Sequence, residues 1–446
     1  LGLGGVGLGA AAVAAPVFHD LDEVIASPQA EFKRPWYVKE VDKPTVEVDW
    51  NMYTRWDYRE SMWQDGMQKA WGPTKTGWIF KMYSANLMKW LKENRPGWTL
   101  RDYALAMSKS VSIPLSFLGP QTTSTPEELG VPRWEGTPEE NARMIRAYLR
   151  ANGCSQVGFV ELDTNTTEKL IYSNDSTPDY GIKFKRNVIA DVDQPSETDE
   201  ERIIPKKARW VIVYTLRLSD EQIERMPTLI GASTIGYTLA LVKQAQLQNF
   251  LRTLGYMGLG ESTRYHEFAS VTGLGVMAGL GETCRVMHLM SPEYGLKQRL
   301  FKLITDLPLA PGKPIDFGAM QFCRTCKKCA DFCPPKAIPN DTEPSWENTV
   351  PYHSQGIRMW RRNEPLCIAY MYEATAASCG ICLAVCPLTK GNRQAFYHDI
   401  MRATISTTPV LNRFFRKMDD FLGYGMKTGE DIEKFWEMDL PPFGWE

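Results

Sequence analysis

Eight of the ten cysteines in this 446-residue chain lie in two blocks with short, regular gaps. The blocks read Cys323-x2-Cys326-x2-Cys329-x3-Cys333-Pro and Cys379-x2-Cys382-x3-Cys386-Pro, with Cys367 upstream of the second. This spacing is the ligand pattern of two iron–sulfur clusters, in which the last cysteine of a block, the one before proline, binds the other cluster. The two blocks therefore predict one-electron transfer chemistry.

The same rule divides the eight thiols into two sets of four. Cluster 1, a 4Fe–4S cluster, takes the thiols of Cys323, Cys326, Cys329 and Cys386. Cluster 2 takes those of Cys333, Cys379 and Cys382. The regular motif would place its fourth ligand at Ala376, so we expect Cys367 to replace it.

Zinc sites and disulfides are the alternative interpretations of these cysteines. A zinc site needs four ligands of its own and does not use the exchanged cysteine before proline. Disulfide frameworks are typical of small secreted domains, and this chain is not small. The remaining two cysteines, Cys154 and Cys284, are expected to be buried apolar residues.

Length and composition describe a globular protein of two or three domains. Hydrophobic residues make up 43% of the chain and charged residues 23%, which allows an ample core. The net charge of −2 and a pI near 6.3 give no basic footprint for nucleic acid. Nine of the 14 tryptophans lie before position 140, where they could surround an apolar ligand or simply pack a core in an irregular, helix-poor segment.

The first 18 residues carry no charge and are rich in glycine and alanine. They are too weakly apolar for a membrane span, and they resemble the hydrophobic part of an export signal. Because low hydrophobicity is typical of twin-arginine signals, which export folded proteins, we expect that route. A flexible leader is the alternative.

The middle of the chain alternates helical and strand patterns. A capping box at Thr137 and Glu140 predicts a helix that ends at Gly153, and a second helix spans 238–254 before Gly255. Strands are expected at 156–162 and 208–215. The polar run 173–206 between them is predicted to be a surface excursion, and 122–132 a linker.

A glycine-rich stretch follows, with glycines at 273, 275, 279 and 281. It is not the G-x-G-x-x-G pattern of a nicotinamide site. Its glycines could let the backbone approach a large cofactor, so Gly273, Gly275, Gly279 and Gly281 are candidate cofactor-binding residues. Ordinary tight turns explain them equally well.

Over nearly its whole length the chain resembles the corrinoid-dependent reductive dehalogenases, and most closely those acting on chloroform and trichloroethane. Besides the cysteine blocks, the stretches that carry the resemblance are 236–237, 254–256, 278–282, 291–295, 306–309, 311–318 and 387–392. The family implies an α/β, nitroreductase-like core that binds a cobamide, with an inserted ferredoxin-like module of two 4Fe–4S clusters. It also implies that two electrons and a proton replace a carbon-bound halogen in organohalide respiration.

The cobamide is expected in the base-off form. The chain has no Asp-x-His-x-x-Gly motif, which in other corrinoid proteins supplies a histidine ligand to cobalt. The family's proton donor, a tyrosine, corresponds to Tyr237, and the arginine beside it to Arg299. Such a guanidinium would stabilise the phenolate left after proton donation. Without the resemblance, a core tyrosine and a surface arginine would be the simpler interpretation.

Two further positions follow from the resemblance. The asparagine that many members carry between these residues is missing, so His266, or less readily Thr263, is expected to take its polar role. Trp360 matches a residue that lines the family's aromatic substrate pocket. Such a pocket discriminates among chlorinated solvents by shape alone, which predicts a broad substrate range.

The expected organisation is a signal remnant (1–18), a tryptophan-rich region (19–135), the corrinoid-binding core (136–315), the ferredoxin-like module (316–400) and a C-terminal segment that packs on the core (401–446). The expected partners are an external electron donor and a small membrane-anchor protein at the outer face of the cytoplasmic membrane. The competing hypotheses are an epoxyqueuosine reductase and an electron-transfer subunit without a substrate.

Overall fold

The computed structural model describes residues 34–61, 67–108, 115–175, 185–261, 268–376, 378–390 and 397–444. The expected signal remnant and the candidates His266 and Thr263 lie outside these ranges. Within them, no helix is long and apolar enough to cross a membrane.

The central sheet has four antiparallel strands in the order β2-β7-β11-β8. They are β2 (Gln156–Glu161), β7 (Trp210–Arg217), β11 (Gln298–Thr305) and β8 (Gly258–Leu259). Side chains alternate between the two faces of a strand. On β7, Ile212 and Tyr214 therefore join the core under α6 (Pro138–Ala151) and α9 (Gly236–Leu254), whereas Val211 and Val213 pack with α10 (Val271–Met277).

The two predicted helices and both predicted strands of this core are confirmed. The Thr137 side chain accepts a hydrogen bond from the Glu140 backbone N–H, and the Glu140 side chain accepts one from the Thr137 N–H, as in a capping box. Helix α9 ends at Gly255, whose φ of +90° favours glycine. Local capping thus sets the limits of the elements that cover one face of the sheet.

The expected surface excursion at 173–206 is wrong. Its described residues form a second sheet in the order β3-β4-β6-β5, in which β4 and β6 are parallel. The strands are β3 (Asn174–Asp175), β4 (Lys185–Ala190), β5 (Ser196–Glu197) and β6 (Glu201–Pro205). Buried Arg202 forms ion pairs with Asp175 and Glu197, which neutralise the charge that made this segment look like a solvated loop.

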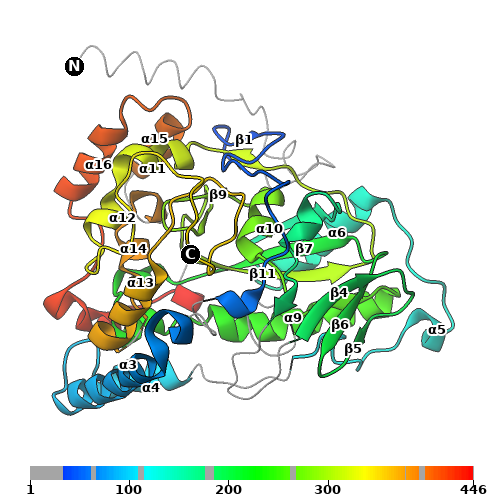
Figure 1. The fold of residues 1–446 in the computed structure, drawn as a ribbon, viewed down its shortest axis with the longest axis horizontal. Helices are drawn as coiled ribbons and strands as arrows, with labels where there is room; N and C mark the ends of the chain where they lie inside the picture. Colours follow the sequence, from blue (N-terminus) through cyan, green and yellow to red (C-terminus); the bar gives the residue numbers. More distant parts are fainter. Residues whose placement is uncertain are drawn as a thin grey trace.

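The tryptophan-rich region is more helical than its weak periodicity suggests. It contains α3 (Met67–Lys92), which bends at Gly72 and Pro73, and α4 (Leu100–Ser108). Figure 1 shows α3 in blue beside α13 (Glu364–Tyr370) in orange, and the two helices are in contact. The short strand β1 (Lys39–Glu40) pairs with β12 (Ile315–Asp316), and α5 (Pro126–Leu129) lies within the expected linker.

The cysteine blocks occupy a mainly helical module at one end of the molecule (Figure 1). Its helices are α11 (Ala319–Cys326), α12 (Lys328–Asp331), α13 and α14 (Ile381–Ala384). The hairpin β9 (Glu282–Thr283) and β10 (Leu289–Met290) joins it to the core, and α7 (Asp220–Glu224) and α8 (Leu229–Ala232) lie before α9.

The C-terminal segment begins with α15 (Tyr397–Ile405) and α16 (Asn412–Phe421). Phe415 and Ile405 enter the core of the cysteine module, and buried Asp419 forms an ion pair with Lys328, between two of the cysteines.

Candidate iron–sulfur and catalytic site

The four thiols assigned to cluster 1 lie close together. Burial raises the pKa of Cys323 to about 12 and also raises the pKa of Cys326 and Cys329. In all three, repulsion from Cys386 contributes to the shift, although Cys386 is about 60 positions away in the chain. Binding to iron would relieve this repulsion, because a thiolate is the form that ligates the metal.

The second set is brought together in the same way. Burial raises the pKa of Cys379 to about 11 and also raises the pKa of Cys367 and Cys382. Cys333 repels each of these three thiols. Ala376, where the regular motif would have its ligand, is buried, and the structure places the thiol of Cys367 in this group.

No three His, Cys, Asp or Glu side chains in the described part of the chain are placed to share one metal ion. A 4Fe–4S cluster has four irons for its four cysteines, so its thiolates need not meet at a single ion. The arrangement of the eight thiols therefore fits two such clusters.

A buried arginine that the sequence did not single out lies against the first cysteine set. Arg285 is 1% exposed, and its guanidinium donates hydrogen bonds to the Cys323 backbone oxygen at 2.7 and 3.2 Å. It also lies over the ring of Trp360, at 4.3 Å from the centroid. This cation offsets part of the negative charge that thiolates bring to the site.

A second cation serves the other set. Arg362 forms a bidentate ion pair with Glu364 and lies within electrostatic reach of Cys367 and Cys382. Burial alone would raise the pKa of Glu364, but Arg362 and His353 outweigh it and lower that pKa to about 2. Neither arginine has a signal in the sequence, because each is recognised only by what it touches.

Glu282 holds the start of the helix that carries the first two cysteines. Its carboxyl accepts hydrogen bonds from the backbone N–H groups of Phe317 and Ala319, both at 2.9 Å, and from the hydroxyl of Thr45 at 2.7 Å. Burial outweighs these bonds and raises its pKa to about 7. Through these hydrogen bonds the carboxyl pairs with backbone N–H groups at the N-terminus of α11, which have no partner within the helix.

The structure brings the predicted pair Tyr237 and Arg299 together. Tyr237 lies in the first turn of α9, and the Arg299 guanidinium on β11 lies 4.8 Å from the centre of its ring. A side chain at Gly236 would come within 3.1 Å of the Arg299 Cγ, so glycine there lets the arginine reach the helix start. Both side chains are half-buried, at one end of the central sheet.

Two features make this pair a polar centre. The Arg299 Nε is buried and has no hydrogen-bond partner among the described residues, so its N–H is free to donate to an oxygen of a bound group. Burial, followed by the charges of Arg362 and Arg299, lowers the pKa of His288 to about 3. His288 is therefore a neutral imidazole near the pair, which sequence reasoning missed.

The four candidate glycines pack against protein. A Cβ on Gly279 would lie 2.2 Å from the Lys313 carbonyl oxygen, and one on Gly281 would lie 2.2 Å from that of Met290. Gly273 and Gly275 are similarly close to leucine side chains. Close packing of the chain on itself explains these glycines, and their cofactor-binding role stays a prediction.

An aromatic cavity of about 210 Å³ lies between the N-terminal region, α10 and the segment before the second cysteine block. Trp50, Tyr53, Trp56 and Tyr172 line it, together with aliphatic side chains. Met287 also lines it and is followed in the chain by His288, whose pKa the charge of Arg299 helps to lower.

Trp360 does not line this cavity. It is 3% exposed and packs with Val48 and Ile357, which do line it, and with Cys323. The side chain thus lies between the cavity wall and the first cysteine set, and its predicted contact with substrate stays untested.

Eight thiols grouped in two sets, together with a tyrosine–arginine pair on a mixed α/β core, are typical of an iron–sulfur oxidoreductase. A family model described as "Reductive dehalogenase subunit" matches residues 33–117 and 110–309, and one described as "4Fe-4S double cluster binding domain" matches residues 322–389. The chain belongs to the reductive dehalogenase family.

Individual relatives agree with this assignment. Chloroethene reductive dehalogenase of Dehalococcoides mccartyi (strain VS) is 28% identical over 100% of this chain and 96% of its own length. Tetrachloroethene reductive dehalogenase of Sulfurospirillum multivorans is 32% identical over 69% of this chain and 61% of its own length. A solved reductive dehalogenase, studied for B12-dependent dehalogenation, has a similar fold, with a TM-score of 0.58 and 20% identity over 96% of this chain and 57% of that one.

The competing epoxyqueuosine reductase hypothesis receives little support. The enzyme of that name from Lactococcus garvieae matches only 30% of this chain, at 31% identity. The reductive dehalogenase relative, in contrast, matches the chain from end to end.

Proposed function

We propose that this protein is a corrinoid-dependent reductive dehalogenase that replaces a carbon-bound chlorine of a small chlorinated hydrocarbon by hydrogen. The observation that carries the proposal is the Arg299 guanidinium, placed 4.8 Å from the ring centre of Tyr237. The reaction consumes two electrons and one proton and releases chloride. The bound cobamide would supply the metal centre at which the carbon–chlorine bond is reduced.

Residues of this chain would donate the proton and stabilise the negative charge that proton donation leaves. Tyr237 would donate its phenolic proton to the carbon that loses chlorine. Arg299 would stabilise the phenolate that remains, and its buried, unpartnered Nε–H could donate a hydrogen bond to a polar group of the cofactor. Neutral His288 adds no positive charge that would compete with Arg299 for the phenolate.

Electrons would enter through the second cysteine set and pass through the first. Phe332 and Leu366, which adjoin Cys333 and Cys367, are 46% and 45% exposed, which leaves this set near the surface for an external donor. The first set lies next to Trp360 and the core, on the side of the aromatic cavity. In this order, cluster 2 would be the outer cluster, which accepts electrons from the donor, and cluster 1 would be the inner cluster.

The aromatic cavity is the proposed substrate site. Its volume of about 210 Å³ and its tryptophan and tyrosine walls suit one- or two-carbon chlorinated compounds, which offer little to hydrogen-bond. The resemblance favours chloroform and trichloroethane, whereas the named relatives act on chloroethenes. A shape-selective pocket separates such compounds by only about 1–3 kcal/mol, so we propose activity on both classes with a preference for the alkanes.

Export by the twin-arginine route stays a proposal that rests on the composition of the first 18 residues, and attachment to a small membrane-anchor partner is a proposal that rests on the resemblance. They would place the protein at the outer face of the cytoplasmic membrane.

The test starts with protein purified without oxygen. About eight irons and one cobalt per chain are expected, with chloride release from chloroform, trichloroethane and tetrachloroethene when reduced viologen supplies electrons. Iron without cobalt, and no chloride release after addition of corrinoid, would leave a plain electron-transfer subunit. Faster turnover of tetrachloroethene than of chloroform would reject the proposed preference for alkanes.

A further inference from the structure

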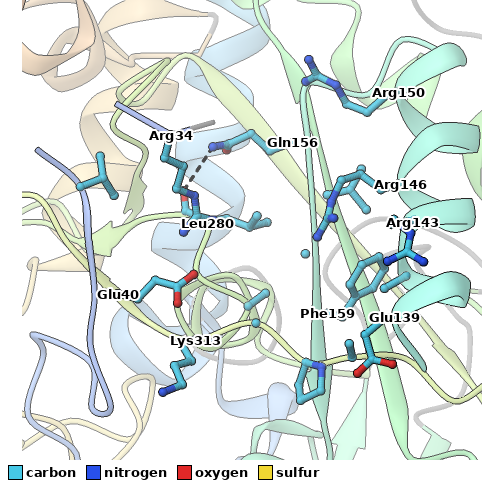
Figure 2. Close-up of a pocket in the computed structure, with 18 of the residues that line it drawn as sticks. Arg34, Glu40, Glu139, Arg143, Arg146, Arg150, Gln156, Phe159, Leu280 and Lys313 are labelled. Carbon is cyan, nitrogen blue, oxygen red and sulfur yellow. Dashed lines mark hydrogen bonds between the residues drawn. The ribbon is translucent and has the colours of Figure 1, made fainter. Parts of the chain in front are cut away.

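A second concavity lies beside the edge of the central sheet. It is a cleft of about 900 Å³ between α6 and the segment that begins at Arg34, and strand β2 forms its floor (Figure 2). Strand β2 is an edge strand of the central sheet, and the backbone N–H of Gly312 donates a hydrogen bond to its Phe159 oxygen at 2.9 Å. The cleft shares no lining residue with the aromatic cavity, the cysteine sets or the Tyr237–Arg299 pair.

Positive side chains line both walls. Arg143, Arg146 and Arg150 follow one face of α6 at spacings of three and four residues. Figure 2 shows them on one side of the cleft, with Arg34 and Lys313 on the other. These five cations face two acidic lining residues, Glu40 and Glu139. Lys313 also pairs with Asp42 at 3.2 Å, and Glu293 lies within electrostatic reach of Arg34 and Arg150. The excess of positive charge therefore lies mainly on the α6 wall.

Contacts with the protein hold several of these guanidinium groups in place. Arg146 lies over the ring of Phe159, at 5.4 Å from its centroid, and Arg150 donates a hydrogen bond to the Ser155 backbone oxygen. Arg34 donates a 2.5 Å hydrogen bond to the Gly279 backbone oxygen. Because these side chains are already held in place, they lose less conformational entropy when a ligand binds.

One arginine remains available. Arg143 is exposed and has no ion pair or hydrogen-bond partner among the described residues. All of its guanidinium N–H groups can donate to a ligand, and two of them can form parallel hydrogen bonds with two oxygens of one phosphate.

The floor of the cleft is apolar. Buried Val157, Phe159 and Leu280 line it, and Trp36 at the rim is 56% exposed. A ligand that fits both parts combines several negative charges with a flat or apolar group. The volume lies within the range of about 300–1,000 Å³ that is usual for small-molecule sites.

We propose that this cleft binds an organic phosphate of nucleotide size. The phosphate lies between the arginines of α6 and the opposite wall, and the ring or apolar part rests on the floor beside Trp36. Two sources have this chemistry: a free nucleotide, and the phosphodiester in the nucleotide portion of a cobamide. The site does not depend on the proposed dehalogenase activity.

The experiment measures ADP binding to the as-purified protein, and to the same protein after removal of cobamide, by titration calorimetry without oxygen. Adenosine serves as the ligand without phosphate. Arg143→Gln is expected to weaken ADP binding about tenfold, the loss of one charge-assisted contact. Arg413→Gln on α16, also exposed and without an ion pair among the described residues, is the matched control and should bind ADP normally.

Equal ADP binding by both preparations would support the site with a free nucleotide as its ligand. Binding only after cobamide removal, together with cobamide loss from Arg143→Gln about tenfold faster than from Arg413→Gln, would support it with the cofactor phosphodiester as the ligand. The proposal is overturned if neither preparation binds ADP, if adenosine binds equally well, if the two variants behave alike, or if the protein binds phosphatidylglycerol vesicles but not ADP. Chloride release is measured separately, so a failure of the dehalogenase proposal leaves this result standing.

Discussion

The charge of Arg299 is the part of the proposed mechanism that the structure lets us quantify. Two unit charges 4.8 Å apart, the distance from the guanidinium to the ring of Tyr237, interact by about 3.5 kcal/mol at an effective dielectric constant near 20. Because both side chains are half-exposed, solvent screening reduces this to about 1–3 kcal/mol. Arg299→Gln should therefore lower kcat for chloride release about 5- to 150-fold, since a phenolate forms only as the reaction proceeds.

Three controls make this prediction specific. Arg299→Lys keeps the charge and should recover a large part of the lost kcat, whereas KM should change little in either variant because the ground state carries no phenolate. Arg413→Gln removes an exposed arginine elsewhere and should be indistinguishable from the unmodified protein. Iron and cobalt contents are measured for each variant, so that loss of cofactor is not mistaken for loss of charge. Unchanged turnover in Arg299→Gln, or a lysine variant as slow as the glutamine variant, would refute the reasoning.

Three further predictions concern the proton donor, the clusters and stability. Tyr237→Phe keeps the ring that Arg299 contacts but removes the proton, so kcat should fall about 10²- to 10⁴-fold while metal content is kept. Tyr256→Phe, whose hydroxyl donates to the Trp134 backbone oxygen, should not slow turnover, and equal rates in both variants would argue against a donor role. Cys367→Ala should lose about four of eight irons, and Cys154→Ala none, by iron analysis; full iron in Cys367→Ala would exclude it as a ligand. Burial raises the pKa of Glu282 to about 7, so its contribution to stability is complete below about pH 4.5 and disappears as the pH rises through 7, a change of about 3 kcal/mol. Urea unfolding followed by tryptophan fluorescence should show this decrease in the free energy of unfolding with rising pH. Glu282→Gln should remove the decrease, and an identical decrease in the variant would contradict the assignment.

Local patterns were good predictors where the physical cause is itself local. The helix at α6 was predicted from the capping box of Thr137 and Glu140, and both reciprocal hydrogen bonds are present. The grouping of the cysteines was predicted from spacing alone, because a cluster imposes its ligand geometry on a short loop. Even the unusual member, Cys367, followed from elimination and lies in the second set.

Prediction failed where a charge is compensated by a distant partner. The segment 173–206 contains many charged residues, and only the folded chain shows that Arg202 is buried against Asp175 and Glu197. Arg285 and Arg362 were missed for the same reason, since a buried arginine is recognised by the backbone oxygens and carboxylates that it meets. Helix α3 was also missed, because its apolar residues pack against several separate segments and leave a weak periodicity.

The sequence by itself determined the iron–sulfur chemistry and the core helices, because these depend on spacing, capping and motifs within a few residues. The choice of Tyr237 and Arg299 as catalytic candidates came from the family resemblance and stays a prediction. Only the tertiary structure decided that Arg299 reaches the ring of Tyr237, that Glu282 caps the helix of the first cysteines, and that five cations from three segments line one cleft. Each of these contacts joins residues that are far apart in the chain. Electrostatic interactions depend on distance and burial, and the order of residues along a chain specifies neither until the chain has folded.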